Sequence, residues 1–199
     1  MNGTVVIADD DPIIRMDIRE MLEAEGYQVA GEAKNGEEAV ELAARLKPDL
    51  IIMDMKMPIM NGIKATRLIQ RLQDTAVLLL TAYSQKDMVQ EAREAGVTAF
   101  LVKPITERNL LPAVEIALGQ KARLYGLKQE IDRLKQTAKE RKTIEKAKGI
   151  LMASLQLNEE DAYRTLRDVS MESRLPMNKL AEQIAEGGAE RLAGFARGG

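Results

Sequence analysis

A short apolar run that ends in a single carboxylate most constrains the fold of this chain. Residues 50–53 are all apolar, and Asp54 follows them directly, ahead of the turn at Pro58. A continuous apolar run this short is typical of a strand that is buried on both faces of a parallel sheet. Because an unpaired carboxylate inside the core is costly, we expect Asp54 at the carboxyl edge of the sheet, where ligands bind in open α/β folds.

Three further apolar runs end in the same way, and we expect each of them to be a buried strand. Residues 4–8 precede Asp9 and Asp10, residues 77–80 precede Thr81, and residues 99–102 precede Lys103. If these strands are parallel neighbours, their polar residues converge with Asp54 on one edge of the sheet. Clustered carboxylates repel one another unless a cation holds them, and Mg²⁺ commonly uses one or two carboxylates together with water and phosphate.

Helical periodicity separates the strands along the first 120 residues. Apolar residues recur at three- and four-residue intervals between the runs described above. This spacing predicts helices over residues 12–25, 35–46, 62–72, 84–95 and 106–119, with a second strand over residues 27–33. Regular alternation of strands and helices predicts a flavodoxin-like α/β fold, with a parallel five-stranded sheet and helices on both faces.

These elements, in this order, resemble the receiver domain of two-component response regulators. The resemblance covers about residues 1–120 and rests on five short motifs: Asp9-Asp10, Asp54 with Met57-Pro58, Asn61-Gly62, Thr81-Ala82 and Lys103-Pro104. The alternative is a flavodoxin-like domain that is not phosphorylated and whose carboxylates cluster by coincidence.

The resemblance implies a role for each residue at the carboxyl edge of the sheet. Asp54 would be the phosphoacceptor, and a sensor histidine kinase would supply the phosphoryl group. Asp9, Asp10, Asp54 and the backbone carbonyl of Lys56 would bind Mg²⁺, while Thr81 and Lys103 would contact the phosphoryl group. Phosphorylation would then reshape the surface around Thr81 and Phe100, and the side chains of Lys56 and Tyr83 would limit the access of water.

Composition excludes several kinds of chemistry. The chain has neither cysteine nor histidine, so disulfides, thiolate or histidine zinc sites, Ser-His-Asp catalysis and a phosphohistidine role are all excluded. The sequence shows neither a secretory signal nor an apolar run of about 18 residues, so we expect a cytoplasmic protein without a membrane span. Residues 1–120 hold 13 basic and 19 acidic side chains, whereas residues 121–199 hold 16 and 12, which favours a polyanionic partner for the second half.

The helical pattern continues past residue 106 without a linker rich in Gly, Pro or Ser. Alternating three- and four-residue steps join Leu110, Ala113, Ala117, Gln120, Leu124, Leu127, Ile131, Leu134 and Ala138. Such a seam, flanked by charged residues, predicts a coiled-coil linker over residues 121–138 and hence a homodimer. The alternative is a long helix that lies on its own receiver domain.

Basic residues become dense where this helix continues. On a helix over residues 142–155, Ile144, Ala147 and Leu151 share an apolar face, whereas Lys142, Lys146 and Gly149 lie opposite. A glycine within a helix costs up to about 1 kcal/mol, so Gly149 needs a reason such as the close approach of another backbone. Asn158 is expected to cap a second helix, a third follows over residues 177–186, and residues 187–199 are expected to be disordered.

This region resembles the ANTAR output domain of antiterminators. The resemblance covers about residues 135–186, is most specific over residues 147–152, and leads us to place the domain at residues 139–186. It implies a small three-helix module that binds stem-loops in nascent messenger RNA and so prevents a terminator hairpin from forming. The expected RNA-binding residues are Lys142, Lys146, Ala147, Lys148, Gly149 and Met152.

Two other outputs remain possible from the sequence. A DNA-binding helix-turn-helix needs basic and base-reading side chains near the start of its recognition helix, and the last helix offers little beyond Arg174 and Lys179. An enzymatic output would need a catalytic constellation beyond Glu145 and the acids at the helix caps. We therefore expect a regulator that catalyses only its own phosphotransfer and dephosphorylation, with no small-molecule substrate other than phosphodonors.

Overall fold

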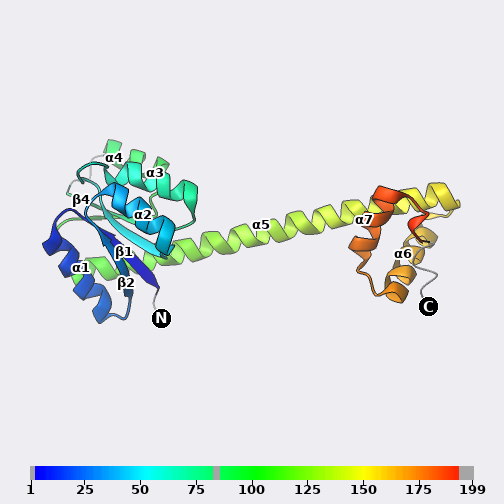
Figure 1. The fold of residues 1–199 in the computed structure, drawn as a ribbon, viewed down its shortest axis with the longest axis horizontal. Coiled ribbons are helices and arrows are strands. Elements are labelled where there is room, and N and C mark those ends of the chain that lie inside the picture. The colour runs from blue at the N-terminus through cyan, green and yellow to red at the C-terminus, as the bar shows by residue number, and fades with distance from the viewer. Residues whose placement is uncertain (1–2, 83–85, 193–199) are drawn as a thin grey trace. The chain divides into compact units, whose positions relative to one another are not determined.

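The computed structural model describes residues 3–82 and 86–192. The chain separates into two compact units, residues 1–126 and residues 127–199. Strands and helices alternate in the first unit, as the sequence predicted (Figure 1). Their bounds are β1 Thr4–Ala8, α1 Pro12–Ala24, β2 Gln28–Ala33, α2 Gly36–Leu46, β3 Leu50–Asp54, α3 Gly62–Leu72, β4 Ala76–Thr81, α4 Lys86–Glu94 and β5 Ala99–Val102, followed by α5 Glu107–Leu155.

The five strands form one parallel sheet in the order β2-β1-β3-β4-β5. β3 lies at its centre, with Ile51 opposite Val6 on β1 and Val77 on β4, and every residue of β3 is buried. This arrangement confirms the predicted flavodoxin-like sheet. Because β1, β3, β4 and β5 are consecutive and parallel, the residues that follow them meet at one edge of the sheet.

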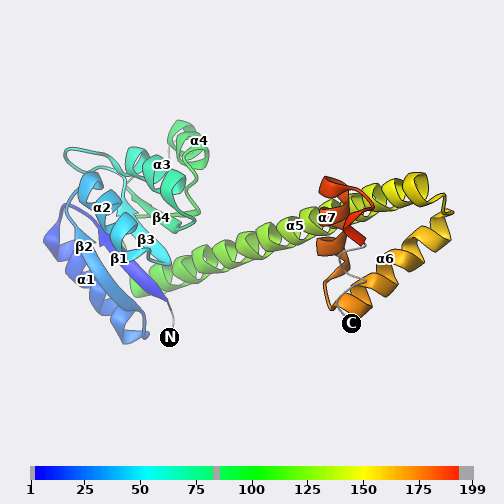
Figure 2. The same ribbon diagram turned by 45° about the vertical axis from the view of Figure 1, so that its right-hand side comes forward.

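Two apolar layers cover the faces of this sheet. Alternate side chains of β1 enter different layers, with Val6 on one side and Ile7 on the other, as the two-residue period of a strand requires. α2, α3 and α4 cover the face that includes Val6, whereas α1 and the beginning of α5 cover the face that includes Ile7 (Figures 1 and 2). Burial on both faces explains why the central strands are uninterrupted apolar runs.

The prediction that β5 is a buried strand was wrong. Phe100 and Val102 are 50% and 40% exposed, because β5 is an edge strand and its burial alternates along the chain. Its apolar sequence resembles that of a central strand, and only the strand order distinguishes the two. β5 nevertheless delivers Lys103 to the carboxyl edge of the sheet, as predicted.

The predicted coiled-coil seam divides into two parts within α5. Leu110 and Ala117 are fully buried in the core of the first unit, so the expectation that they line a coil was wrong there. Apolar contact with the sheet explains this difference, because the first turns of α5 cover the same face as α1. Over residues 122–139 the helix is exposed, and an apolar stripe over residues 124–134 keeps its three- and four-residue spacing.

The second unit packs the end of α5 against two short helices, α6 Glu159–Ser173 and α7 Met177–Gly187. Asn158 caps α6 as predicted, since its Oδ1 accepts a hydrogen bond from the Asp161 N–H at 2.8 Å. The core joins all three helices through Ala147, Leu151, Ala162, Leu166, Leu180, Ala181 and Ile184. Ala189 and Leu192 also contact this core, so the expectation that the tail is disordered was wrong for residues 187–192. Residues 193–199, on which the rest of that expectation falls, lie outside the described residues.

Gly62, the first residue of α3, links the fold to the carboxyl edge of the sheet. Its N–H donates to the Met55 carbonyl at 3.0 Å, and a Cβ at this position would collide with the Asp54 carbonyl oxygen. Overpacking against backbone typically costs about 1–3 kcal/mol. We therefore expect Gly62→Ala to lower the unfolding free energy of the first unit by that amount, measured by hydrogen exchange of the β3 and β4 amides in increasing urea.

Gly119→Ala is the matched control for this substitution. Gly119 lies within α5, and apart from the neighbouring backbone of this helix no heavy atom of the described residues comes within 4 Å of the position that a Cβ on it would occupy. Alanine there should raise the unfolding free energy by about 0.5–1 kcal/mol, because it restricts the unfolded chain and meets no obstacle in the helix. The two substitutions should therefore change stability in opposite directions. A Gly62→Ala variant as stable as the wild type would contradict the close approach of α3 to Asp54.

Candidate functional site

Asp54 ends the central strand with its carboxylate buried at the edge of the sheet. The residue is 6% exposed, and its two carboxylate oxygens contact different partners. Oδ1 lies 2.6 Å from the Lys103 Nζ, and Oδ2 accepts a hydrogen bond from the Lys56 N–H at 2.7 Å. The carboxylate therefore has both an ionic partner and a backbone donor, although the strand that carries it is wholly buried.

Asp9 follows β1 and repeats this arrangement. Asp9 is fully buried. Its Oδ2 lies 2.8 Å from the Lys103 Nζ, and its Oδ1 accepts a hydrogen bond from the Asp11 N–H at 3.0 Å. In both aspartates, one oxygen binds the N–H two residues further along the chain, as in an Asx turn. Lys103 thus joins the ends of β1, β3 and β5 through one ammonium group.

Burial sets the charge balance of this cluster. Desolvation raises the pKa of Asp54, and the nearby Asp9 carboxylate raises it further, while Lys103 and the Lys56 N–H oppose the rise. Burial alone would lower the pKa of Lys103, but its hydrogen bonds to Asp54 and Asp9 raise it instead. Two carboxylates share one ammonium group, so the cluster is suited to a second cation.

The other residues that the sequence predicted for this site differ in burial and in contacts. Thr81 is the last residue of β4 and is buried. Its carbonyl oxygen accepts a hydrogen bond from the Lys103 N–H at 2.8 Å. Asp10 and Lys56 are exposed beside the two buried aspartates. Phe100 lies half-exposed on the edge strand. Tyr83 is outside the described residues.

The donor set fits a hard cation only in part. Over residues 3–82 and 86–192, no three Asp or Glu side chains gather closely enough to form a metal cluster. Two buried carboxylates do meet, however, and Mg²⁺ commonly takes one or two carboxylates together with water. The residues present therefore fit a partly hydrated Mg²⁺ better than a cage made of protein ligands alone.

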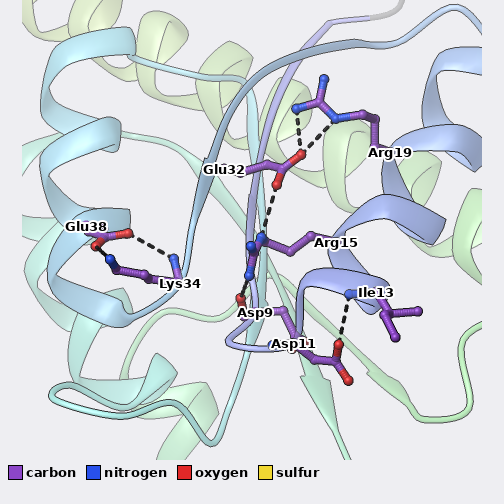
Figure 3. Close-up of polar contacts among 8 residues, drawn as sticks. All are labelled: Asp9, Asp11, Ile13, Arg15, Arg19, Glu32, Lys34 and Glu38. Carbon is purple, nitrogen blue, oxygen red and sulfur yellow. Dashed lines mark hydrogen bonds and ion pairs between the residues drawn. The ribbon is translucent and has the colours of Figure 1, made fainter.

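Three residues beside this site were missed by the sequence analysis. Arg15 Nη1 donates to the Asp9 carbonyl at 2.7 Å, and Glu32 on β2 binds both Arg15 and Arg19 on α1 (Figure 3). Two arginines four residues apart on a helix, with one acid in an otherwise uncharged strand, could have signalled this contact. Asp11 was also unassigned, and it caps α1 through the Ile13 N–H at 2.8 Å.

A second candidate site lies on the part of α5 that belongs to the second unit. Lys142 and Lys146 are exposed, one helical turn apart. Among the described residues, and apart from the helix's own neighbouring backbone, no heavy atom lies within 4 Å of the position that a Cβ on Gly149 would occupy. Packing of the described residues against Gly149 therefore does not account for the glycine, and the helix surface there has room for a closely approaching partner.

Ala147 and Lys148 differ from these exposed residues. Ala147 is fully buried in the core of the second unit, so the expectation that it lines an RNA-binding surface is corrected. Lys148 is also buried, and its Nζ lies 2.8 Å from the Glu159 Oε1 and 3.0 Å from the Glu145 Oε1. The hydrogen bond to Glu159 contributes most to raising the pKa of Lys148, and the hydrogen bond to Glu145 raises it further. The Glu159 contact also links α5 to the start of α6. Met152 is 36% exposed.

Over residues 3–82 and 86–192, no helix is both long enough and apolar enough to cross a bilayer.

Comparison with known families identifies both halves of the chain. Residues 5–115 match the response regulator receiver domain, and residues 132–184 match the ANTAR domain. The transcriptional regulatory protein PdtaR of Mycobacterium tuberculosis is 43% identical over 182 residues, which cover 92% of this chain and 89% of that protein. The ANTAR match lies across the predicted output helices, so a DNA-binding helix-turn-helix is not favoured.

Other relatives match the first unit alone. The chemotaxis protein CheY of Thermotoga maritima is 42% identical over 115 residues, which cover 57% of this chain and 96% of that protein. The crystal structure of the response regulator domain of Thermotoga maritima CheB aligns with a TM-score of 0.55 at 33% identity, covering 58% of this chain and 96% of that one. These matches agree with the observed parallel sheet.

The raised pKa of Asp54 has a measurable consequence for stability. Because the folded-state pKa lies above the unfolded one, the wild type loses stability as the pH rises between the two values. Asp54→Asn should therefore be more stable than the wild type near pH 7, by on the order of 1 kcal/mol for relief of a partly compensated buried charge. This gain should vanish in acid, as measured by urea denaturation in EDTA across a pH series.

Asp49→Asn provides a control of opposite sign. Lys121 and the Thr4 N–H lower the pKa of Asp49, so the stability due to this carboxylate is present at neutral pH and lost as the pH falls through the folded-state pKa. Asp49→Asn should accordingly be less stable than the wild type near pH 7. If both variants shift stability in the same direction, the assigned charge balance at Asp54 is wrong.

Proposed function

Because the chain belongs to the response regulators that carry a receiver domain and a C-terminal ANTAR domain, we propose that it couples phosphorylation of Asp54 to RNA binding. A sensor histidine kinase supplies the phosphoryl group, the phosphorylated chain dimerises, and the dimer binds stem-loops in nascent messenger RNA. This binding prevents terminator hairpins and causes transcription antitermination. The proposal also places the protein in the cytoplasm, where its kinase and nascent RNA are available.

The observation that carries the receiver half of the proposal is the contact between Lys103 and two buried aspartates. Asp54 presents an ionised oxygen at the edge of the sheet, where a phosphodonor can approach. That oxygen attacks phosphorus, forming an acyl phosphate as the bond from phosphorus to the donor's nitrogen or oxygen breaks. Lys103 and the Thr81 hydroxyl then bind the oxygens of the transferred group, because the ammonium already lies within 2.6 Å of Asp54 Oδ1.

Mg²⁺ is the proposed cofactor of this step. Asp9, Asp10, Asp54 and the backbone carbonyl of Lys56 would hold it, and when bound it would neutralise charge on the phosphoryl oxygens. The chain's own residues orient the acceptor, since the Lys56 N–H fixes Asp54 Oδ2 and leaves Oδ1 for exchange of partners. Long side chains at Lys56 and Tyr83 would slow hydrolysis of the product by limiting water access.

We propose three segments that carry these roles. Residues 1–120 form the receiver domain, residues 121–138 the linker, and residues 139–186 the ANTAR domain. The matched ranges, 5–115 and 132–184, support the two domains, and the ANTAR match begins within the proposed linker.

The exposed stripe on α5 supports dimerisation. Leu124, Leu127, Ile131 and Leu134 are each at least 50% exposed and repeat at steps of three and four residues. Charged residues flank this stripe on both sides, as at the edges of a two-stranded coiled coil. Burial of four aliphatic side chains per chain is a modest contribution, so the pairing can be biased by a coupling of about 1–3 kcal/mol from the receiver domain. We propose that changes around Thr81 and Phe100 supply this bias.

Exposed basic side chains support the RNA half of the proposal. Lys142 and Lys146 offer positive charge on one helical surface, and the open space beside Gly149 allows a nucleic-acid backbone to approach closely. We propose that Met152 completes this surface, while Lys148 supports it indirectly through its ion pairs with Glu145 and Glu159. Two such surfaces in a dimer would bind a pair of stem-loops more tightly than either alone.

Phosphorylation is tested with a small phosphodonor. Acetyl phosphate with Mg²⁺ should add one phosphoryl group to the wild type and none to Asp54→Asn, because only Asp54 ends the central strand with an oxygen bridged to Lys103. Intact-protein mass spectrometry measures the added mass, and peptide mapping locates it. A phosphoryl group on any other residue would overturn the assignment.

Dimerisation and RNA binding should be separable by substitution. Lys146→Ala should weaken binding to a two-hairpin RNA and reduce its salt dependence by about one unit of slope, while phosphorylation-dependent dimerisation is unchanged. Leu127→Lys should abolish that dimerisation and, with it, the tight binding. Sedimentation and RNA titration over a salt series measure both effects.

Lys128→Ala is the matched control for the basic surface, because Lys128 is an exposed lysine on the linker helix rather than on the proposed RNA surface. Loss of RNA affinity equal to that of Lys146→Ala would mean that binding follows overall charge alone. A phosphorylated wild type that remains monomeric, with or without RNA, would contradict the proposed switch.

A further inference from the structure

The backbone of Asp9 is held at two successive points. Its N–H donates to the Ala33 carbonyl at 3.2 Å, which extends the pairing of β1 with β2 past the end of the strand. Its carbonyl oxygen accepts from Arg15 Nη1 at 2.7 Å, as Figure 3 shows. The peptide group between Asp9 and Asp10 is therefore oriented by a side chain of α1.

Glu32 fixes the guanidinium that makes this contact. Arg15 Nε donates to Glu32 Oε2 at 3.0 Å, and Glu32 is the residue that precedes Ala33 on β2. The other oxygen, Oε1, accepts from Arg19 Nε at 2.8 Å and Nη2 at 2.6 Å. Arg19, Glu32 and Arg15 thus form a continuous chain of hydrogen bonds that ends on the Asp9 carbonyl (Figure 3).

This chain is well sheltered for a network of charged side chains. The Arg15 and Glu32 side chains are only 17% and 28% exposed, which limits their screening by solvent. Burial would raise the pKa of Glu32, but its hydrogen bonds to Arg19 and Arg15 outweigh that effect and lower it. The network therefore stays fully charged near neutral pH, and an arginine fork holds its partners in a fixed geometry.

Orientation of one peptide group matters because two neighbouring carboxylates depend on it. The peptide unit is planar, so a fixed Asp9 carbonyl also fixes the direction in which the chain leaves toward Asp10. Asp9 is anchored at its side chain by Lys103 and by the Asp11 N–H, whereas Asp10 is exposed. Among the contacts described for this loop, the Arg15 bond is the one that acts on the peptide group joining the two acids.

We propose that Arg15 is a positioning residue for the acidic pair: with Glu32 and Arg19 it sets the Asp9–Asp10 peptide so that both carboxylates can bind a divalent cation together. The inference rests on the proposed function, because it assumes that this pair holds Mg²⁺. It goes further by assigning a role to three residues on α1 and β2 that are not among the proposed ligands of the cation or the phosphoryl group.

The test compares Mg²⁺ affinity in the full chain, measured by NMR chemical shifts of the β1 and β3 amides, without a phosphodonor. Arg15→Gln should bind Mg²⁺ about tenfold more weakly than the wild type, which is the scale for loss of an outer partner of a metal ligand. Arg15→Lys should fall between them, since one ammonium keeps the charge but cannot bond Asp9 and Glu32 in the same geometry. Glu32→Gln should also bind Mg²⁺ more weakly than the wild type, and this variant provides the test if Arg15→Gln does not fold.

Phosphorylation by acetyl phosphate gives a second, kinetic measurement. The Mg²⁺ concentration at half-maximal rate should rise by the same factor in Arg15→Gln, while the maximal rate at saturating Mg²⁺ stays that of the wild type. A purely structural role would lower thermal stability or the maximal rate without moving the Mg²⁺ dependence, and that result would overturn the proposal.

Arg67→Gln is the matched control, because Arg67 forms an exposed ion pair with Glu91 on α4 and should leave Mg²⁺ affinity unchanged. Wild-type affinity in both Arg15→Gln and Glu32→Gln would overturn the positioning role and leave the proposed function intact. If the wild type itself binds no Mg²⁺ and accepts no phosphoryl group, the proposed function fails and this inference fails with it.

Discussion

One ammonium group between two buried carboxylates organises the functional edge of the first unit. Lys103 Nζ lies 2.8 Å from Asp9 and 2.6 Å from Asp54, and it reaches them from the end of the edge strand β5. Without this cation, two carboxylates would share a largely desolvated position, which is strongly unfavourable. The contact depends on the strand order, because only consecutive parallel strands bring the ends of β1, β3 and β5 to one place.

The remaining features of this edge restrict how the two carboxylates can move. Backbone N–H groups from Asp11 and Lys56 bind one oxygen of each aspartate, and Arg15 holds the Asp9 carbonyl from α1. The Gly62 backbone also lies close against the Asp54 carbonyl. Such preorganisation suits a reaction in which the protein supplies charge and orientation, as phosphoryl transfer requires.

Helix α5 has three different environments along its length. Its first turns complete the core of the first unit through Leu110 and Ala117, and its last turns complete the core of the second through Ala147 and Leu151. Between them the helix is exposed and carries an apolar stripe. The same repeating pattern of apolar residues therefore contributes to two intramolecular cores and to one surface that a second copy of the chain is proposed to cover.

Much of the fold and of the candidate site followed from local sequence. Apolar runs ending in Asp9, Asp54, Thr81 and Lys103 predicted the strands and their shared edge, because burial on both faces leaves polar residues only at strand ends. Asn158 predicted a helix start, because its side chain satisfies an N–H group of the first turn. In these cases the residues that determine a strand end or a helix start lie within a few positions of it in the sequence.

Only the tertiary structure decided which apolar surfaces are covered and which charges are paired. The sequence of β5 resembles a buried strand, yet its place at the sheet edge exposes Phe100. Ala147 and Lys148 belong to a basic segment, yet α6 and α7 enclose the alanine and Glu159 binds the lysine. The network of Arg15, Arg19 and Glu32 likewise joins residues on two elements. Periodicity reports the face of an element, but burial and ion pairing depend on neighbours that are distant in sequence.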